Sequence, residues 1–342
     1  MTRSILRSSV RRFPPIARRD QAIERLKRRL RLLSDEKAEL QRQLDEGHKE
    51  WRTAFVERPS FQSRIHAERR LTQLAEETGA PLSGVIKHGK FHVYDLARSY
   101  GIEPPVEFGR WSDPRDIAWD DLPDHVVIKP AFGTNGQGVH PLRRFADGWQ
   151  IITHQRTKTV EELTASLAAL VERRKVGPPF IAEEFLDEDG TGDRLPTDVK
   201  VYAFYGEVLM IVLRRPGKFG EPAPKTPFRV IDPAGRDMTE IETGSLLDGS
   251  LSFPKNLDAI VDAASRLSVG IRAPFSRIDL YGINDRVRFG EVTPRPGGSA
   301  WHGAALDRVL GDAWDRAETR LKLDIAQGLD PEPGFGPVVA GQ

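Results

Sequence analysis

The sequence contains no cysteine and only three methionines in 342 residues. Without cysteine, disulfides, thiolate metal sites and a cysteine nucleophile are excluded. No apolar stretch approaches the ~20 residues that a helix needs to span a bilayer. Of the eight histidines, only His140 and His302 fall near the motifs described below, and no Ser-His-Asp set is evident. Each of these two is better explained as a polar loop residue than as a catalytic base.

Charge is nearly balanced overall but divided along the chain. Residues 1–57 hold 15 Lys/Arg and 9 Asp/Glu, a net of +6, and the remainder holds 36 and 41, a net of −5. Residues 1–19 contain six arginines and no acid. This composition predicts a disordered basic tail attracted to anionic lipid, with a transit sequence as the alternative. Arginine runs without interleaved aromatics argue against nucleic-acid binding.

Residues 20–51 carry a heptad pattern. Lys37 falls at a core position, Trp51 at a later one, and charged residues flank the remaining core positions, which are Ile23, Leu26, Leu30, Leu33, Leu40 and Leu44. The pattern predicts a long helix and a parallel or antiparallel coiled coil, so that the chain would form a homodimer or bind a hetero-partner. The alternative is a helix that lies on the protein's own body.

The rest of the chain alternates helical and strand patterns. Residues 58–104 predict helices broken at Gly79-Ala80-Pro81, and residues 105–125 look like a connector. Strands are expected at 126–128, 149–153 and 180–186 and hairpins at 198–213 and 277–293, with helices at 160–172, 257–267 and 304–325. Residues 216–234 are rich in proline and glycine and are expected to lack regular structure.

Residues 126–138 combine a short buried strand, Lys129 and a glycine-rich loop. Glycines at this density let backbone N–H groups approach an anion, and a nearby lysine supplies a compact charge for phosphate oxygens. The segment has neither a Gly-Lys-Ser/Thr ending nor the dinucleotide spacing. It therefore predicts a flap between two strands that closes over phosphates, or else an ordinary hairpin loop. The loop residues are Gly133, Thr134, Asn135, Gly136 and Gly138.

A second group of polar residues lies on the expected hairpin 277–293. Side chains alternate across a strand, so Glu291 and Thr293 share a face, and Asp279 can lie opposite them. Two carboxylates and a hydroxyl form an incomplete set of oxygen ligands that suits Mg²⁺. Arg295, in the following Arg-Pro-Gly-Gly-Ser segment, could hold a carboxylate or stabilise developing negative charge. The alternative is a pair of exposed acids on a surface hairpin.

These motifs, in this order, resemble the ATP-grasp superfamily of ATP-dependent carboxylate–amine ligases. Lys129-Pro130 with its glycine loop resembles the family's phosphate lysine and flap, and residues 182–186 resemble its adenine hinge strand. Asp279 and the segment from Glu291 to Gly298 resemble its metal strands. Residues 196–207 and 289–293 are most similar to the teichuronopeptide-biosynthesis (TupA-like) branch. The resemblance covers about residues 87–298 and implies an α+β ATP-grasp fold, with two α+β subdomains clamping ATP between antiparallel sheets.

The resemblance also implies residue roles. Lys90, Lys129 and Lys200 would contact phosphates, and an acid in 187–189 would reach the ribose. Asp279 and Glu291 would hold Mg²⁺, while Thr293 stands where the family has Asn, which leaves one or two metal ions open. Arg214, Arg215 and Arg295 are candidates for the acyl phosphate or the substrate carboxylate. Adenine would be framed by Glu183, Glu184, Phe185 and Leu186.

The implied reaction joins an acid to an amine. A substrate carboxylate attacks the γ-phosphate of ATP, and an amine then displaces phosphate from the acyl phosphate; this chemistry needs positioning and charge neutralisation more than a dedicated nucleophile. The resemblance suggests a cytoplasmic or membrane-peripheral enzyme of cell-surface polysaccharide or peptide conjugation. An ATP-dependent kinase on the same fold and a non-catalytic nucleotide-binding scaffold are the alternatives. The expected parts are a tail (1–19), a coiled-coil helix (20–57), an N-terminal or linker subdomain (58–125), the ATP-grasp domain (126–330) and a flexible tail (331–342).

Overall fold

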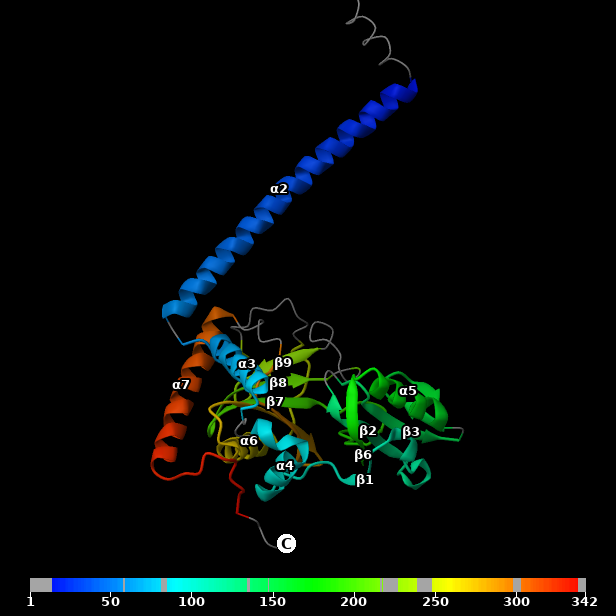
Figure 1. Ribbon diagram of the computed structural model, residues 1–342, viewed down its shortest axis with the longest axis vertical. Coiled ribbons are helices and arrows are strands. Elements are labelled where there is room, and N and C mark those ends of the chain that lie inside the picture. Colours follow the sequence, from blue (N-terminus) through cyan, green and yellow to red (C-terminus); the bar gives the residue numbers. More distant parts are fainter. Residues whose placement is uncertain are drawn as a thin grey trace, which may run out of the picture. The chain divides into compact units, whose positions relative to one another are not determined.

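The computed structural model describes residues 14–57, 59–80, 85–133, 136–146, 148–215, 217, 227–238, 248–297 and 303–337, and the side chains of 14–17, 48–57 and 85–90 lie outside this description. The chain divides into two units, residues 1–58 and residues 59–342, and each is described by itself. Figure 1 shows the elements of both units. Among the described residues, no helix is long and apolar enough to cross a membrane.

The described residues of the first unit form a single helix, α2 (Pro14–Glu57), of 44 residues. Its two leading prolines fit because the first turn of a helix needs no intrahelical N–H partner. The predicted long helix is therefore present. The leucines of the heptad pattern lie on its surface, from Leu44 at 52% exposure to Leu30 at 72%.

The described residues of the second unit form two antiparallel sheets. The six-stranded sheet has the order β1-β6-β2-β3-β4-β5 and the five-stranded sheet has the order β11-β10-β7-β8-β9. The first comprises β1 (Glu107–Trp111), β2 (His125–Gly133), β3 (His140–Phe145), β4 (Gly148–Ile151), β5 (Arg156–Lys158) and β6 (Val176–Glu184). The second comprises β7 (Asp198–Phe204), β8 (Glu207–Arg214), β9 (Phe228–Ile231), β10 (Ser276–Ile283) and β11 (Arg286–Thr293).

Helices cover both faces of the five-stranded sheet. Alternate residues of β7 make this possible: Val199 and Val201 enter a core with α4 (Val85–Ser99) and α6 (Leu257–Ile271), whereas Tyr202 and Phe204 enter a core with α3 (Phe61–Thr78) and α7 (Ala304–Ala326). Because strand side chains alternate, the polar residues in register with Tyr202 and Phe204 lie on the α3/α7 side. That face carries the second predicted site.

In the part of the chain that the structure describes, α5 (Val160–Glu172) is the helix that packs on the six-stranded sheet. It begins with a capping box between Thr159 and Glu162 and buries Leu163 and Leu167 in the core of this sheet. The helix has the bounds that the sequence predicts. The short 3-10 helices η1 (Pro114–Asp116) and η2 (Trp119–Asp121) add Trp119 to the same core.

Three sequence predictions need correction. Residues 105–125 are more than a connector, because β1 pairs with β6 at the edge of the sheet. The strand expected at 180–186 begins earlier, at Val176, and ends at Glu184, where pairing with β2 ends. Within 216–234, β9 extends the second sheet by pairing with β8. The C-terminal segment contacts the rest of the second unit as far as Gly336. The N–H of Gly336 donates to Ser99 Oγ at 2.9 Å.

Candidate active site

The predicted phosphate lysine belongs to a buried charged cluster. Lys129, on β2, forms an ion pair with Glu183 on β6, whose side chain is only 2% exposed. Tyr94, on α4, completes the group: its hydroxyl donates to Glu183 Oε1 at 3.0 Å and accepts from Lys129 Nζ at 3.0 Å. Burial, followed by the charge of Glu183, holds the pKa of Tyr94 far above its usual range, so it stays a neutral hydrogen-bonding group.

The next carboxylate of the predicted hinge strand connects the two sheets. Glu184 on β6 forms an ion pair with Arg288 on β11 and accepts from the backbone N–H of Val106 at 3.1 Å. Arg288 also donates to the carbonyl of Pro104 at 3.0 Å. Burial works against ionisation of Glu184, but its hydrogen bonds to Arg288 and to the N–H of Val106, together with the charge of Arg288, lower its pKa. Glu184 is thus ionised and links the two sheets through its ion pair with Arg288. Its role at adenine stays a prediction.

The glycine loop forms a turn that needs glycine. Gly136 and Gly138 have φ of +67° and +74°, in the left-handed region that side chains disfavour. A Cβ at Gly138 would also lie 3.3 Å from the ring of Pro130. The predicted hairpin is present, since β2 pairs with β3 on the other side of the loop. Thr134 and Asn135 lie outside the described residues, as does the side chain of Lys90.

Arg277 lies at the centre of the predicted metal ligands. β10 and β11 pair so that Asp279 is opposite Glu291 and Arg277 is opposite Thr293. Arg277 Nη2 lies 2.8 Å from Asp279 Oδ2, 3.3 Å from Glu291 Oε1 and 2.9 Å from Thr293 Oγ1. The three predicted ligands therefore converge on one point, which a guanidinium nitrogen occupies.

Lys200 extends this cluster across β7. Its ammonium lies 2.5 Å from Asp279 Oδ2 and 2.6 Å from Asp198 Oδ2. Burial alone would lower the pKa of Lys200, but Asp198 and Asp279 outweigh it and raise the pKa, so the side chain keeps its charge. Asp198 Oδ1 is buried and has no hydrogen-bond partner among the described residues.

Asp279 and Glu291 differ sharply in their surroundings. Asp279 is 2% exposed; burial opposes its charge, but Arg277 and Lys200 prevail and lower its pKa. The Glu291 side chain is 60% exposed, yet the surrounding protein, followed by the charge of Asp279, raises its pKa. The carboxylate of Glu291 is therefore open to water, and the negative charge of Asp279 disfavours its ionised form. A cation that bound there would relieve this repulsion.

The oxygens of Asp279, Glu291 and Thr293 suit a hard cation, provided that Arg277 moves away from them. Two carboxylates and a hydroxyl are ligands that Mg²⁺ accepts, and the unpaired oxygen of Asp198 adds a further acceptor nearby. However, both oxygens of Asp279 are already bonded to Arg277 and Lys200. Among the described residues, no group of three or more Asp, Glu or His side chains is arranged to hold a metal. Direct binding by Asp279 therefore requires Arg277 to move.

The predicted catalytic arginines occupy different surroundings. Arg295 is anchored to α3 by its bond to Thr72 Oγ1, and Arg69 of α3 donates to the carbonyl of Pro296 at 3.1 Å. Arg214 ends β8, where it pairs in register with Asp198, so it lies beside the Lys200 cluster. Arg215 donates to Thr197 Oγ1 at 2.8 Å and lies 3.7 Å from Glu188.

The remaining predicted hinge residues follow β6. Phe185 and Leu186 are buried after the strand ends, and the Phe185 ring lies 6.0 Å from that of His125. The acidic loop then folds on itself: Asp187 accepts from the N–H groups of Gly190 and Gly192 at 2.9 and 2.8 Å. His140 is partly buried on β3, and desolvation lowers its pKa to about 4, so it is neutral at physiological pH.

Three residues of these clusters escaped the sequence prediction: Tyr94, Asp198 and Arg277. Arg277 had a usable signal, because it precedes Asp279 by two residues and so shares its strand face. Asp198 likewise precedes Lys200 by two. Tyr94 had none, since it is 35 residues from Lys129 and 89 from Glu183 and meets them only through packing of α4.

The sequence profile of the TupA-like ATP-grasp family matches residues 87–315, two thirds of the chain. The chain belongs to the TupA-like ATP-grasp family. The matched region contains both charged clusters and excludes α2. The predicted family and fold class are confirmed.

Several solved structures are similar to this TupA-like chain at low identity. The D-alanine–D-alanine ligase from Bacillus anthracis complexed with ATP is 15% identical, with a TM-score of 0.44 over 75% of this chain and 76% of that chain. A Chryseobacterium gregarium RiPP-associated ATP-grasp ligase in complex with ADP and a leader and core peptide is 13% identical, with a TM-score of 0.39 over 76% and 70%. The ATP-grasp ligase PsnB is 15% identical, with a TM-score of 0.37; 68% of this chain and only 57% of that chain are covered. No curated protein matches the chain.

Tyr94→Phe is expected to weaken ATP binding in this TupA-like protein. The change removes the hydroxyl that joins Lys129 to Glu183, at a cost of about 1.5–3 kcal/mol because the bonds involve charged groups. We expect a several-fold higher KM for ATP and a lower urea midpoint. The matched control is Tyr100→Phe, whose hydroxyl donates to the Gly334 carbonyl at 2.9 Å, away from both clusters; it should leave KM unchanged. Equal KM values for both variants would show that Tyr94 does not position Lys129.

Proposed function

We propose that this TupA-like protein is an ATP-dependent carboxylate–amine ligase that forms an amide through an acyl phosphate. The observation that carries the proposal is the convergence of Asp279, Glu291 and Thr293 on one point beside Lys200, within the region that the family profile matches. A cluster with fixed positive and negative groups suits phosphoryl transfer, which depends on positioning and charge neutralisation.

The first step transfers the γ-phosphoryl group of ATP to the substrate carboxylate. A carboxylate oxygen bonds to the γ-phosphorus of ATP and the bond from that phosphorus to the β,γ-bridging oxygen breaks, releasing ADP. We propose that Lys129 and the glycine loop hold the phosphates from the six-stranded sheet and that Lys200 holds them from the five-stranded sheet. Lysine ammonium groups act as compact charges for phosphate oxygens. When Mg²⁺ is bound, by Glu291, Asp279 and Thr293, it would neutralise phosphate charge.

The second step forms the amide bond and releases phosphate. The amine nitrogen bonds to the acyl carbon, phosphate leaves with the bond electrons, and the amine loses a proton. Arginines suit this stage because the guanidinium presents paired donors to carboxylate and phosphate oxygens. We propose Arg295, Arg214 and Arg277 for this role. Arg277 already contacts the predicted metal ligands, so it is placed where negative charge changes during the reaction.

We further propose substrates from cell-surface polysaccharide or peptide conjugation, and a cytoplasmic site of action. The basic residues at the start of the chain favour a peripheral contact with anionic membrane. Residues 20–51 are proposed to mediate association, because their leucines are exposed along one helix.

A screen of carboxylates and amines for stimulated ADP formation tests the proposal. We expect ADP and free phosphate to appear in equal amounts only when an acid and an amine are both present. A phosphorylated product without phosphate release would instead identify a kinase. ATP turnover that no acid and amine pair stimulates would contradict the ligase assignment.

Lys129→Met tests the phosphate lysine and is expected to abolish stimulated ADP formation. It also leaves Glu183 buried without its cation, which costs about 3–5 kcal/mol of unfolding free energy. The double variant Lys129→Met/Glu183→Gln removes both charges and should recover most of that stability without recovering turnover. Lys322→Met, at an exposed ion pair of α7, is the matched control. Turnover restored in the double variant would show that Lys129 matters only for stability.

A further inference from the structure

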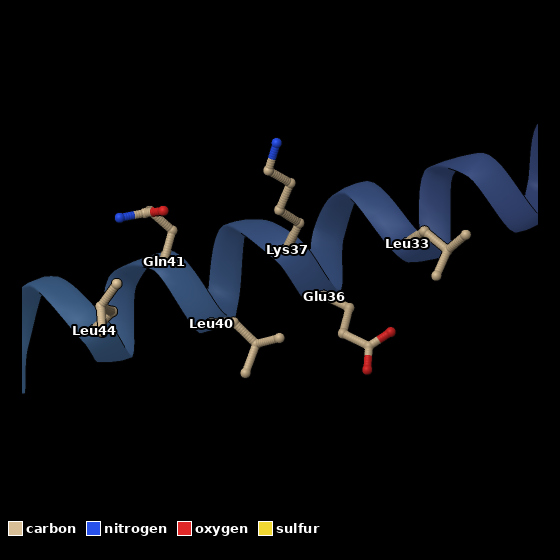
Figure 2. A pocket seen from close by; sticks show the side chains of 6 residues that line it. All are labelled: Leu33, Glu36, Lys37, Leu40, Gln41 and Leu44. Carbon is tan, nitrogen blue, oxygen red and sulfur yellow. The ribbon is translucent and has the colours of Figure 1, made fainter. Parts of the chain in front are cut away.

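Helix α2 carries an apolar seam that the first unit leaves uncovered. We define the α2 seam as Ile23, Leu26, Leu30, Leu33, Lys37, Leu40 and Leu44. Figure 2 shows Leu33, Lys37, Leu40 and Leu44 with Glu36 and Gln41 beside them. The leucines of the seam are 52–72% exposed. A continuous exposed apolar stripe of this kind indicates an interaction surface.

Charge divides α2 into two halves of opposite sign. Residues 18–31 hold seven Lys/Arg and two Asp/Glu, a net of +5, whereas residues 32–47 hold two and five, a net of −3. A parallel second copy would place the basic half against the basic half. An antiparallel second copy would place each basic half against an acidic half. The charge distribution therefore identifies a complementary partner for α2, namely α2 itself in the reverse direction.

We propose that α2 pairs with α2 of a second copy as an antiparallel coiled coil centred between Arg31 and Leu32. In this register Leu30 faces Leu33 of the second copy, and Ile23 faces Leu40. Each pairing occurs twice by symmetry. Leucine and isoleucine therefore cover one another at these four layers, and Leu26 faces Lys37 at the remaining two.

Lys37 explains why the reverse direction is preferred. In a parallel pair, two Lys37 side chains would meet at the same core layer, and like charges there destabilise the pair. In the antiparallel pair, Lys37 faces Leu26 of the second copy. Its four-carbon stem can then cover apolar surface while the ammonium reaches water.

The flanking charges agree with this register. Arg29 and Glu36 precede core positions, so they meet across the antiparallel interface, once on each side. In a parallel pair Arg29 would face Ser34 and Glu36 would face Gln41, which gives no ion pair. Among the described residues, neither Arg29 nor Glu36 forms an ion pair within the chain, whereas Lys27 pairs with Glu24 at 3.0 Å. The two side chains are thus available for the second copy.

The inference deepens the proposal that residues 20–51 mediate association and is independent of the ligase reaction. Its direct test is cysteine crosslinking of the full chain, because the sequence contains no other thiol. Purified Ile23→Cys and Leu40→Cys proteins, one carrying a size tag, are mixed under mild oxidation. We expect a crosslink between positions 23 and 40 in the mixture and none within either protein alone. In the antiparallel pair, identical positions lie 17 residues apart along the axis, roughly 25 Å, too far for a disulfide.

Charge reversal provides an independent test by light scattering across a concentration series. Arg29→Glu should raise the dimer dissociation constant roughly tenfold, because it replaces two attractive pairs with two repulsive ones. Arg29→Glu/Glu36→Arg should restore it to within about threefold. Arg28→Glu makes the same change in charge one position away, on the outer face, and should have at most a small effect.

Three results would overturn the inference. The first is crosslinking of each single-cysteine protein with itself and none between them, which identifies a parallel pair. The second is a purified full chain that remains monomeric at high concentration, which removes the association proposal as well. The third is an equal effect of Arg28→Glu and Arg29→Glu with no recovery in the double variant. Ligase assays on the same proteins report on the reaction separately, so the two proposals fail independently.

Discussion

Asp279→Asn is expected to lower the free energy of unfolding by about 3–5 kcal/mol and to abolish stimulated ADP formation. Asp279 is 2% exposed, and its oxygens accept from Arg277 at 2.7 and 2.8 Å and from Lys200 at 2.5 Å. Loss of its charge leaves the buried cations Arg277 and Lys200 with less neighbouring negative charge. Breaking such a buried network costs several kcal/mol of unfolding free energy. Urea unfolding and an ADP assay measure the two effects.

The matched control is Asp262→Asn on α6. Asp262 also pairs with an arginine, Arg266, at 2.9 Å, but it is 65% exposed. Exposed pairs contribute little, so we expect a change below about 1 kcal/mol and unaltered turnover. Comparable losses in the two variants would show that the cluster around Arg277 is not the buried network described above.

Acid unfolding gives the same variant a second readout. The folded-state pKa of Asp279 is lowered, so its contribution to stability is fully present above the pKa of an unfolded aspartate. It is lost as pH falls through the folded value. Asp279→Asn should therefore flatten the decline of unfolding free energy below about pH 4, the ordinary range of an aspartate. An unchanged acid profile would contradict the lowered pKa.

Glu291→Gln is expected to reduce stimulated ADP formation by about 100-fold or more with little change in stability. Removing a charge aimed at a reacting group typically costs about 10²–10³ in rate. The Glu291 side chain is 60% exposed, and its contact with Arg277 is 3.3 Å long. Desolvation by the surrounding protein, followed by repulsion from Asp279, raises the pKa of Glu291, so the neutral variant should be as stable as the parent or slightly more stable.

Exposed Glu172 at the end of α5 provides the control, as Glu172→Gln, which should change neither quantity. Isothermal titration with Mg²⁺ and a non-hydrolysable ATP analogue then separates binding from chemistry. Weaker magnesium-dependent binding in Glu291→Gln alone would support the proposed metal role. Full ATP turnover in this variant would eliminate the predicted site.

Local patterns made the hairpins predictable. The β10–β11 hairpin turns at Asn284 and Asp285, whose φ values of +49° and +59° suit the short polar residues found there. Alternation along two strands then places Asp279 near Glu291 and Thr293 once the strands pair. The same reasoning predicted α5, because its N-terminal capping box and its leucine spacing both lie within a short stretch of the sequence.

Pairing between distant segments was not predictable in this way. Residues 105–125 look like a connector because the five residues of β1 are too few to show a clear strand pattern, and only pairing with β6 makes the segment a strand. Similarly, Arg288 is one of many arginines in the sequence, and its ion pair with Glu184 depends on how the two sheets lie. Propensity is a weak guide where tertiary partners decide.

The sequence by itself determined the order of motifs, the long helix with its heptads and the sign of charge along it, because periodicity and composition act over short distances. The tertiary structure alone decided which charges meet. It placed Tyr94 between Lys129 and Glu183, and it placed Arg277 among the oxygens that the sequence assigned to a metal. The physical reason is that a buried charge is stabilised by whichever partner packing brings within hydrogen-bond distance, and that partner need not be near it in the chain.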